Sequence, residues 1–129
     1  MSKAYGRVKW VFLEKIMLQM GFHERWVQIV MNCVTSVTYK IKVNGSCTQR
    51  MFPQRGIRQG DPLSPYLFIL CAEGLSAMLQ NVEYDGRIEG IKICRGAPRV
   101  NHLFFADDSL ILMRARVSDA QEQTHFRGI

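Results

Sequence analysis

The chain has 129 residues, of which 47% are hydrophobic, so it has about the length of one domain and can bury a real core. Seventeen basic against eleven acidic residues give a formal net charge of +6, a balance that favours a polyanionic partner. No apolar run approaches the roughly 20 residues of a membrane-spanning helix, which argues against a membrane partner.

The cysteines form no Cys-x-x-Cys pair, and no histidine lies at ligand spacing from them, so a zinc site is not expected. Because the sequence shows neither a signal peptide nor a transit peptide, we expect an intracellular protein of the nucleus or cytoplasm, with a mitochondrial location as the alternative. In these compartments the cysteines are predicted to be reduced and mostly buried. They are Cys33, Cys47, Cys71 and Cys94.

Two amphipathic helices are predicted in the first third of the chain. Apolar residues recur every three or four positions from Val8 to Met20, and Gly21 then ends the helix. A second stripe of the same kind runs from Trp26 to Val37. Both helices are expected to face a core.

A β-hairpin is predicted next. Residues 38–43 alternate between polar and apolar side chains, as in a half-exposed strand. Asn44 and Gly45 then supply a two-residue turn, so residues 46–50 are expected to fold back as the partner strand.

The longest irregular stretch, residues 49–62, contains three arginines, three glutamines and two glycines. Such donors can contact phosphates, bases or sugars, and glycine lets a ligand approach the backbone. The alternative is an ordinary solvated connection. Ser64 is a favourable N-cap and Pro65 a favourable first residue for a helix that reaches Met78, so the loop leads into a helix N-terminus that favours anions.

A strand is predicted over residues 87–94, a turn over 95–98, and then a hairpin whose apolar strands flank Asp107 and Asp108. Adjacent carboxylates resist burial unless something compensates for their desolvation. One interpretation is a hairpin tip that presents both to a divalent cation bound to a phosphate. The other is a solvated turn. Beyond residue 115 the periodicity disappears, and residues 116–129 are predicted to be an irregular tail.

Three stretches of the sequence resemble the central palm motifs of reverse transcriptases. They are Ser2-Lys-Ala-Tyr5 with Val8-Lys-Trp10, then Arg55-Gly-Ile-Arg-Gln-Gly-Asp-Pro-Leu-Ser-Pro-Tyr-Leu-Phe68, and Phe105-Ala-Asp-Asp108. The sequences of these motifs are most similar to those of plant LINE-type retrotransposons, which lack long terminal repeats. The resemblance covers residues 1–115 as a partial domain, palm with part of the fingers. It implies an α+β fold in which helices pack on one face of a small, largely antiparallel sheet.

The resemblance implies two-metal nucleotidyl transfer, in which Mg²⁺, or Mn²⁺ as the alternative, activates the primer 3′-hydroxyl and stabilises the departing pyrophosphate. Asp107 and Asp108 match the family's paired acidic motif, and Asp107 matches its principal metal ligand. The implied partners are an RNA template, a DNA primer and deoxynucleoside triphosphates.

Four further positions are candidates for substrate contacts. Gln59 and Gly60 match the family's turn that faces the template and the nucleotide. Tyr5 matches the aromatic residue that stacks under the incoming sugar and excludes a 2′-hydroxyl, although it could instead cap the core side of the first helix. From the residue type alone we add Arg58, and with it Arg55, as expected phosphate contacts.

The sequence departs from the family in its first motif. The leading aspartate, the third catalytic carboxylate, would lie immediately before Met1, and the closing aspartate is replaced by Gly6. The thumb, the primer grip and most of the fingers are not represented either. A cation held by few ligands binds weakly. We therefore expect that this polypeptide alone does not polymerise DNA and that a complementing polymerase fragment is a candidate partner.

Two other classes of function stay open at this stage. The chain could be a non-catalytic module that binds RNA or DNA through its basic loop, with a steep salt dependence and no metal requirement. It could also be a relic open reading frame with no selected activity. Group II intron maturases share the paired aspartates, but the sequence of residues 58–65 resembles theirs less well.

Overall fold

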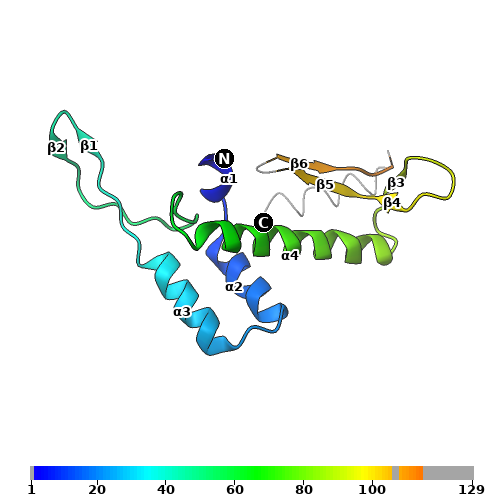
Figure 1. Cartoon of the computed structure of the whole chain (residues 1–129), viewed down its shortest axis with the longest axis horizontal. Helices are drawn as coiled ribbons and strands as arrows, with labels where there is room; N and C mark the ends of the chain where they lie inside the picture. The colour runs from blue at the N-terminus through cyan, green and yellow to red at the C-terminus, as the bar shows by residue number, and fades with distance from the viewer. Residues whose placement is uncertain (1, 106–107, 115–129) are drawn as a thin grey trace. The chain divides into compact units, whose positions relative to one another are not determined.

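The computed structural model describes residues 2–105 and 108–114 (Figure 1). These residues form four helices and three two-stranded antiparallel sheets, which confirms the predicted α+β fold class. None of the helices in these ranges is long and apolar enough to cross a membrane. The chain divides into two compact units, Ser2–Cys71 and the residues from Ala72 onward, which we call the N-terminal unit and the C-terminal unit. Helix α4 (Ser64–Tyr84) belongs to both, because the boundary lies within it.

The N-terminal unit contains α1 (Ser2–Tyr5), α2 (Trp10–Gln19), α3 (Glu24–Thr35) and the first turns of α4. Helices α2 and α3 confirm the two apolar stripes, and α1 is a single additional turn. Most of the buried apolar side chains of this unit form one cluster. Its members are Val8, Leu13, Met17, Val27, Val30, Met31, Val34, Ile57, Leu67 and Cys71.

Helix α2 ends where the sequence predicts it. Gly21 has a φ of 84°, in the left-handed region that glycine adopts most easily. The backbone N–H of Phe22 donates to the Met17 carbonyl at 3.1 Å, and that of Gly21 donates to the Leu18 carbonyl at 3.0 Å. These two bonds form a Schellman motif, which satisfies carbonyls that the helix end would leave unpaired.

The predicted hairpin is present, with shorter strands than expected. Strand β1 (Lys42–Val43) pairs with β2 (Ser46–Cys47) in antiparallel register. Asn44 and Gly45 have φ values of 48° and 85°, as a type I′ turn requires. The turn prediction is therefore confirmed, whereas the strands cover only part of residues 38–50.

A side-chain hydrogen bond explains why these strands are short. The backbone N–H of Ile41 donates to the Thr48 hydroxyl at 2.9 Å instead of to a backbone carbonyl. The N–H of Thr48 still donates to the Ile41 carbonyl at 2.8 Å, so this pair keeps one of its two backbone bonds. Beyond it the strands meet only in a single bridge between Tyr39 and Met51. All residues of both strands are exposed, so no core stabilises a longer ladder.

The C-terminal unit contains two strand pairs, β3 (Ile91–Lys92) with β4 (Arg99–Val100) and β5 (His102–Phe105) with β6 (Asp108–Ile111). The predicted strand over 87–94 is mostly wrong, since only β3 forms within it. The reason is that Arg87, Ile88 and Gly90 contact the end of α4 instead of a neighbouring strand. The N–H of Arg87 donates to the carbonyl of Val82, in the last turn of α4, at 3.1 Å.

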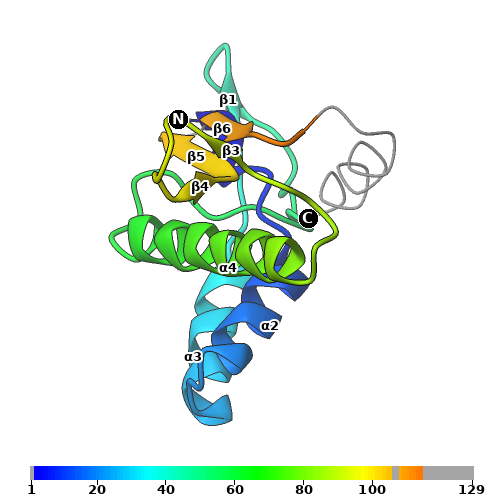
Figure 2. The ribbon, with the colours of Figure 1, turned by 90° about the vertical axis from the view of Figure 1, so that its right-hand side faces the viewer.

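The β5–β6 hairpin packs on the second half of α4 (Figure 2). Leu79 and Val82 of α4 and Ile88 are buried, and Phe104 of β5 and Ile111 of β6 pack against them. Within the C-terminal unit, therefore, a helix covers one face of an antiparallel strand pair, as the predicted fold class requires.

The prediction that the cysteines are mostly buried is wrong. All four are free thiols, but only Cys71 is buried, while Cys33, Cys47 and Cys94 are exposed. Cys47 lies in the exposed hairpin and Cys94 follows the short strand β3, so neither has a core beside it.

Candidate active site

The irregular stretch before α4 is bound to the start of the chain by three hydrogen bonds. The N–H of Gly56 donates to the Val8 carbonyl at 2.7 Å, and the N–H of Ile57 donates to the Tyr5 carbonyl at 2.9 Å. The indole N–H of Trp10 donates to the Gly56 carbonyl at 2.7 Å. The first and second of the palm-like motifs therefore contact each other, and this part of the loop is held in place rather than solvated.

Gly56 is a site residue that the sequence analysis missed. Its φ of 90° lies in the left-handed region, where side chains other than hydrogen are strained. A Cβ at this position would lie 3.0 Å from the Cα of Gly6 and 3.1 Å from its carbonyl oxygen. Both the conformation and the close approach of two backbones require glycine here. The spacing of this glycine from Gly60 was visible in the sequence, but its partner at position 6 was not.

Tyr5 lies at the edge of the N-terminal core. Its ring stacks on that of Phe68, with centroids 5.0 Å apart and planes 22° from parallel. Tyr5 is half-buried and packs against the apolar cluster. The contacts fit the structural alternative for this residue, a cap on the core, and its role toward an incoming sugar stays a prediction.

The turn formed by Arg58, Gln59 and Gly60 is exposed and is braced against the start of α4. Gly60 has a φ of 84°. The Asp61 carboxylate accepts a hydrogen bond from the backbone N–H two residues later at 2.8 Å. The buried Ser64 hydroxyl donates to the Arg58 carbonyl at 2.5 Å. The hydroxyl that we expected to cap α4 therefore holds the turn, which leaves the predicted contact groups open to a ligand.

A cavity of about 180 Å³ lies beside this turn, within the N-terminal unit. Val34 and Leu67 form part of its apolar wall, and Arg58 and Asp61 contribute polar groups. Pockets for complete small-molecule ligands are usually about 300–1,000 Å³. This cavity is therefore too small to enclose a nucleoside triphosphate.

Asp108 is the first residue of β6 and pairs with Phe105, the last residue of β5. Both side chains are exposed, whereas the preceding Phe104 is half-buried against α4. Because cross-strand partners share a face of the sheet, the Asp108 carboxylate lies on the solvent side of the hairpin. Asp107, the other predicted metal ligand, lies outside the described residues.

Carboxylate oxygens suit a hard divalent cation, so the donor chemistry of the exposed Asp108 fits Mg²⁺ or Mn²⁺. Within residues 2–105 and 108–114, however, no three His, Cys, Asp or Glu side chains form a group that could hold a metal ion. The predicted residues also fall in different units. Tyr5 and the turn at residues 58–60 belong to the N-terminal unit, and Asp108 belongs to the C-terminal unit.

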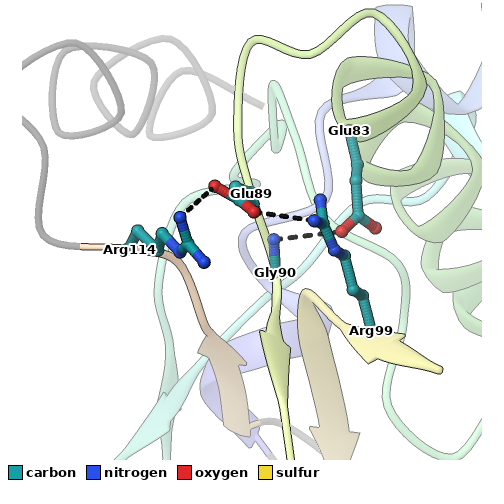
Figure 3. A network of polar contacts seen from close by, with 5 residues as sticks. All are labelled: Glu83, Glu89, Gly90, Arg99 and Arg114. Carbon is teal, nitrogen blue, oxygen red and sulfur yellow. Dashed lines mark hydrogen bonds and ion pairs between the residues drawn. The ribbon is translucent and has the colours of Figure 1, made fainter. Parts of the chain in front are cut away.

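An ion-pair network that the sequence analysis missed joins several segments of the C-terminal unit (Figure 3). The Glu89 carboxylate lies 2.7 Å from the Arg99 guanidinium and 3.0 Å from that of Arg114. The N–H of Gly90 donates to the Glu83 carboxylate of α4 at 3.0 Å. The network links α4, the approach to β3, strand β4 and the residues after β6. No local sequence signal marks it, because its members are far apart in the chain.

The model of the family "Reverse transcriptase (RNA-dependent DNA polymerase)" matches residues 1–126. The chain belongs to the reverse transcriptase family. The resemblance stated from the sequence motifs is thereby confirmed at the level of the family. Reverse transcriptases act on nucleic-acid templates with deoxynucleoside triphosphates and generally use divalent metal ions.

Several proteins similar to this member of the reverse transcriptase family come from retrotransposable elements. An uncharacterized mitochondrial protein of Arabidopsis thaliana is 52% identical over 67 residues, 52% of this chain and 55% of the relative. A retrovirus-related Pol polyprotein from the type-1 retrotransposable element R2 of Popillia japonica is 32% identical over 111 residues, 85% of this chain and 15% of the relative. The transposon TX1 uncharacterized 149 kDa protein of Xenopus laevis is 28% identical over 111 residues, 86% of this chain and 8% of the relative. The chain thus spans about half or less of the length of these curated relatives.

Proposed function

We propose that this chain is the central palm portion of a reverse transcriptase from a plant LINE-type retrotransposon without long terminal repeats, and that it works as part of a longer polymerase. The main support for this proposal is the hydrogen bond from the Ile57 N–H to the Tyr5 carbonyl. Ile57 directly precedes the exposed turn at residues 58–60. The hydrogen bond therefore joins the segment of Tyr5 to the segment of this turn, and the resemblance assigns both to contacts with the incoming nucleotide. The 52% identity to a plant protein supports the plant origin.

In this proposal Asp107 and Asp108 hold the Mg²⁺ or Mn²⁺ ions. The isolated chain binds these ions only weakly. The bound metal would supply activation of the primer 3′-hydroxyl and stabilisation of charge on the pyrophosphate. Arg58 binds a phosphate through its exposed guanidinium, and Gln59 and Gly60 orient the template and nucleotide. The carboxylate that completes the site comes from outside these 129 residues, from a preceding segment of a longer chain or from a complementing polymerase fragment.

A primer-extension assay tests this division of roles. The purified chain, with a primed RNA, deoxynucleoside triphosphates and Mg²⁺, is expected to give no extension product. A longer polymerase that contains this chain, a preceding strand that ends in aspartate, the fingers and a thumb is expected to extend the primer, and Asp107→Ala is expected to abolish that extension. Robust Mg²⁺-dependent incorporation by the 129 residues alone, lost in Asp107→Ala, would contradict the proposal that the site needs a further carboxylate.

Transcript mapping tests whether the chain is part of a longer polymerase. The nucleotides upstream of the Met1 codon are translated in frame from the mapped 5′ end. We expect the frame to continue into a strand that ends in aspartate. A stop codon directly upstream would favour a complementing fragment or a relic frame. The genome that carries the transcript also decides between a nuclear and a mitochondrial origin, of which the second is supported by the mitochondrial relative.

Nucleic-acid binding distinguishes the proposed polymerase role from a non-catalytic binding module. Arg58→Gln is expected to weaken binding to a labelled primer–template and to lower the slope of log affinity against log salt by about 1, because one phosphate contact is lost. Arg25→Gln, an equal charge change at an exposed position of α3, is the matched control. Equal effects of both variants would show that only net charge matters. Selectivity for a primed RNA over a plain duplex, measured by fluorescence anisotropy, favours the polymerase role.

Two variants address the remaining assignments. In the longer polymerase, Tyr5→Ala is expected to raise ribonucleotide incorporation relative to deoxyribonucleotide incorporation, whereas a variant that only unfolds more easily would support the core-capping role.

We also propose that residues 1–115 are the partial domain and 116–129 a tail. A chain that ends at residue 115 should then keep the thermal unfolding temperature of the full chain, and a clear decrease would contradict this boundary.

A further inference from the structure

A chain of hydrogen bonds links α4 to the start of β5. Asn101, which directly precedes β5, is 5% exposed. Its side-chain amide donates to the Leu79 carbonyl at 3.3 Å and to a Glu83 carboxylate oxygen at 2.7 Å, both on α4. Its side-chain oxygen contacts Nδ1 of His102. The other ring nitrogen of His102, Nε2, lies 2.8 Å from the hydroxyl of Ser76, which is also on α4.

The partners in this chain determine where the protons lie. The amide nitrogen of Asn101 faces a carbonyl and a carboxylate, which only accept, so the other side-chain atom is the oxygen. Because that oxygen can only accept, Nδ1 of His102 carries the proton. In the neutral ring Nε2 is then the acceptor, and the Ser76 hydroxyl donates to it. We call Ser76, His102 and Asn101 the α4–β5 relay.

The relay is attached to the β5–β6 hairpin, whose second strand begins with Asp108. His102 is the first residue of β5, and the four-pair ladder that begins with it ends with the pair of Phe105 and Asp108. The Asn101 carbonyl also accepts the N–H of Leu112 at 2.8 Å, so the residue before β5 and the residue after β6 are joined. A two-stranded hairpin is marginally stable by itself, and its position therefore depends on such anchors.

A serine–histidine pair also occurs in acyl-transfer sites, but the surroundings argue against that role. Ser76 lies inside α4, where the backbone N–H groups around it are used by the helix. No donors are left there to stabilise an oxyanion. The pair is half-buried between a helix and a strand. The relay thus has the properties of a support for β5.

We propose that Ser76, His102 and Asn101 are positioning residues that fix β5 on α4 and thereby position Asp108, the first residue of β6, for metal binding. This inference rests on the proposed function, in which Asp107 and Asp108 hold a divalent cation. Removal of groups that orient metal ligands typically costs about 10–100-fold in metal affinity. The relay acts through the length of β5, so we expect a loss near the lower end, about 10-fold.

Mn²⁺ is the probe for the test. The full chain is titrated with Mn²⁺, and binding is measured by the enhancement of water proton relaxation. His102→Phe keeps an aromatic ring beside Phe104, whose centroid lies 4.7 Å from that of His102, and removes both ring nitrogens. Its Mn²⁺ affinity should fall by about 10-fold at a temperature where circular dichroism shows a folded chain. His102→Gln, whose amide can accept from Ser76, should recover part of the affinity.

Controls separate the relay from the proposed metal site. Glu73→Gln removes an exposed carboxylate of α4 in the same unit, outside the relay, and should leave Mn²⁺ affinity unchanged. Asp107→Asn should abolish binding. If Mn²⁺ binding is absent or insensitive to Asp107→Asn, the proposed metal role fails and the inference falls with it. If Asp107→Asn abolishes binding but His102→Phe leaves the affinity unchanged, the inference alone is overturned. If His102→Phe does not fold, Ser76→Ala replaces it in the test. The expected loss of Mn²⁺ affinity is then smaller, and an unchanged affinity would again overturn the inference.

Discussion

The two units of the chain are stabilised by different interactions. Among the residues that the structure describes, the N-terminal unit contains one cluster of ten buried side chains, whereas the buried cluster of the C-terminal unit has three, Leu79, Val82 and Ile88. The C-terminal unit has in addition the buried Asn101 with its partners and the ion pairs of Glu89. An apolar core can repack around side chains of similar volume and different shape. A buried hydrogen bond, in contrast, is lost when its donor and acceptor are no longer aligned. The comparison suggests that apolar contacts stabilise the first unit, while polar contacts orient the elements of the second.

The largest effect is expected from truncation of the larger core. Leu13 and Leu79 are each 0% exposed, one in each cluster. Leu13→Ala should lower the free energy of unfolding by about 2–5 kcal/mol, and Leu79→Ala by less, because fewer buried neighbours surround it. Both tryptophans, Trp10 and Trp26, belong to the N-terminal unit, so urea unfolding followed by fluorescence reports that unit. An equal shift of the fluorescence transition in both variants would show that the units unfold together.

The second prediction concerns the glycine that joins the loop to the start of the chain. Gly56→Ala should cost about 1–3 kcal/mol, because it adds a strained φ and a contact of 3.0 Å with the Gly6 backbone. Gly96 has the same φ of 90°, with no atom within 4 Å of the added Cβ. Gly96→Ala therefore measures the conformational strain alone. Thermal unfolding of both variants tests the difference, and equal losses would show that the close approach to Gly6 has no energetic consequence.

Local features of the fold could be predicted from the sequence. The apolar stripes predicted α2 and α3, Gly21 predicted the end of α2, and Asn44 with Gly45 predicted the hairpin turn. Each of these signals depends on residues within a few positions of one another. Strand lengths were predicted less well, because the bond between Ile41 and the Thr48 hydroxyl competes with the backbone ladder.

The candidate site shows the same division between local and distant information. The paired aspartates and the Gln59-Gly60 turn could be recognised from short motifs. The anchoring of Gly56 to Val8 and the relay at His102 could not, because each joins segments that are far apart in the chain. A polar Asn101-His102 pair at the start of an otherwise apolar strand was the visible signal of the relay.

A smaller effect is expected at the ion pairs of the C-terminal unit. The Arg99 and Arg114 side chains are 45% and 57% exposed, so solvent screens their attraction to Glu89. Glu89→Gln should therefore cost no more than about 1 kcal/mol at low salt. Raising the salt concentration should reduce the difference from the unmodified chain. Hydrogen exchange of residues 89–100 measures this locally. A loss that does not depend on salt would mean that Glu89 acts through hydrogen bonds rather than through charge.

The smallest pH-dependent effect at neutral pH is expected for Cys71, since the titration of its thiol contributes only in alkali. Burial raises the pKa of the Cys71 thiol from its ordinary value of 9.0 to about 12. Above pH 9 the unfolded chain loses this proton while the folded chain keeps it. The free energy of unfolding should then fall by up to about 1.4 kcal/mol per pH unit until the pH reaches the raised pKa. Cys71→Ala should remove this slope in urea unfolding measured above pH 9, and an unchanged slope would assign it to other groups.

The same thiol reports on the opening of one unit. The thiolate is the reactive form, so the exposed Cys33, Cys47 and Cys94 should react with a thiol reagent before Cys71 does. Cys71 belongs to the apolar cluster of the N-terminal unit, and its reaction requires that cluster to open. Leu13→Ala should therefore accelerate the labelling of Cys71, whereas Leu79→Ala should not. Acceleration by both would mean that α4, which runs through both units, transmits the loss of packing from one cluster to the other.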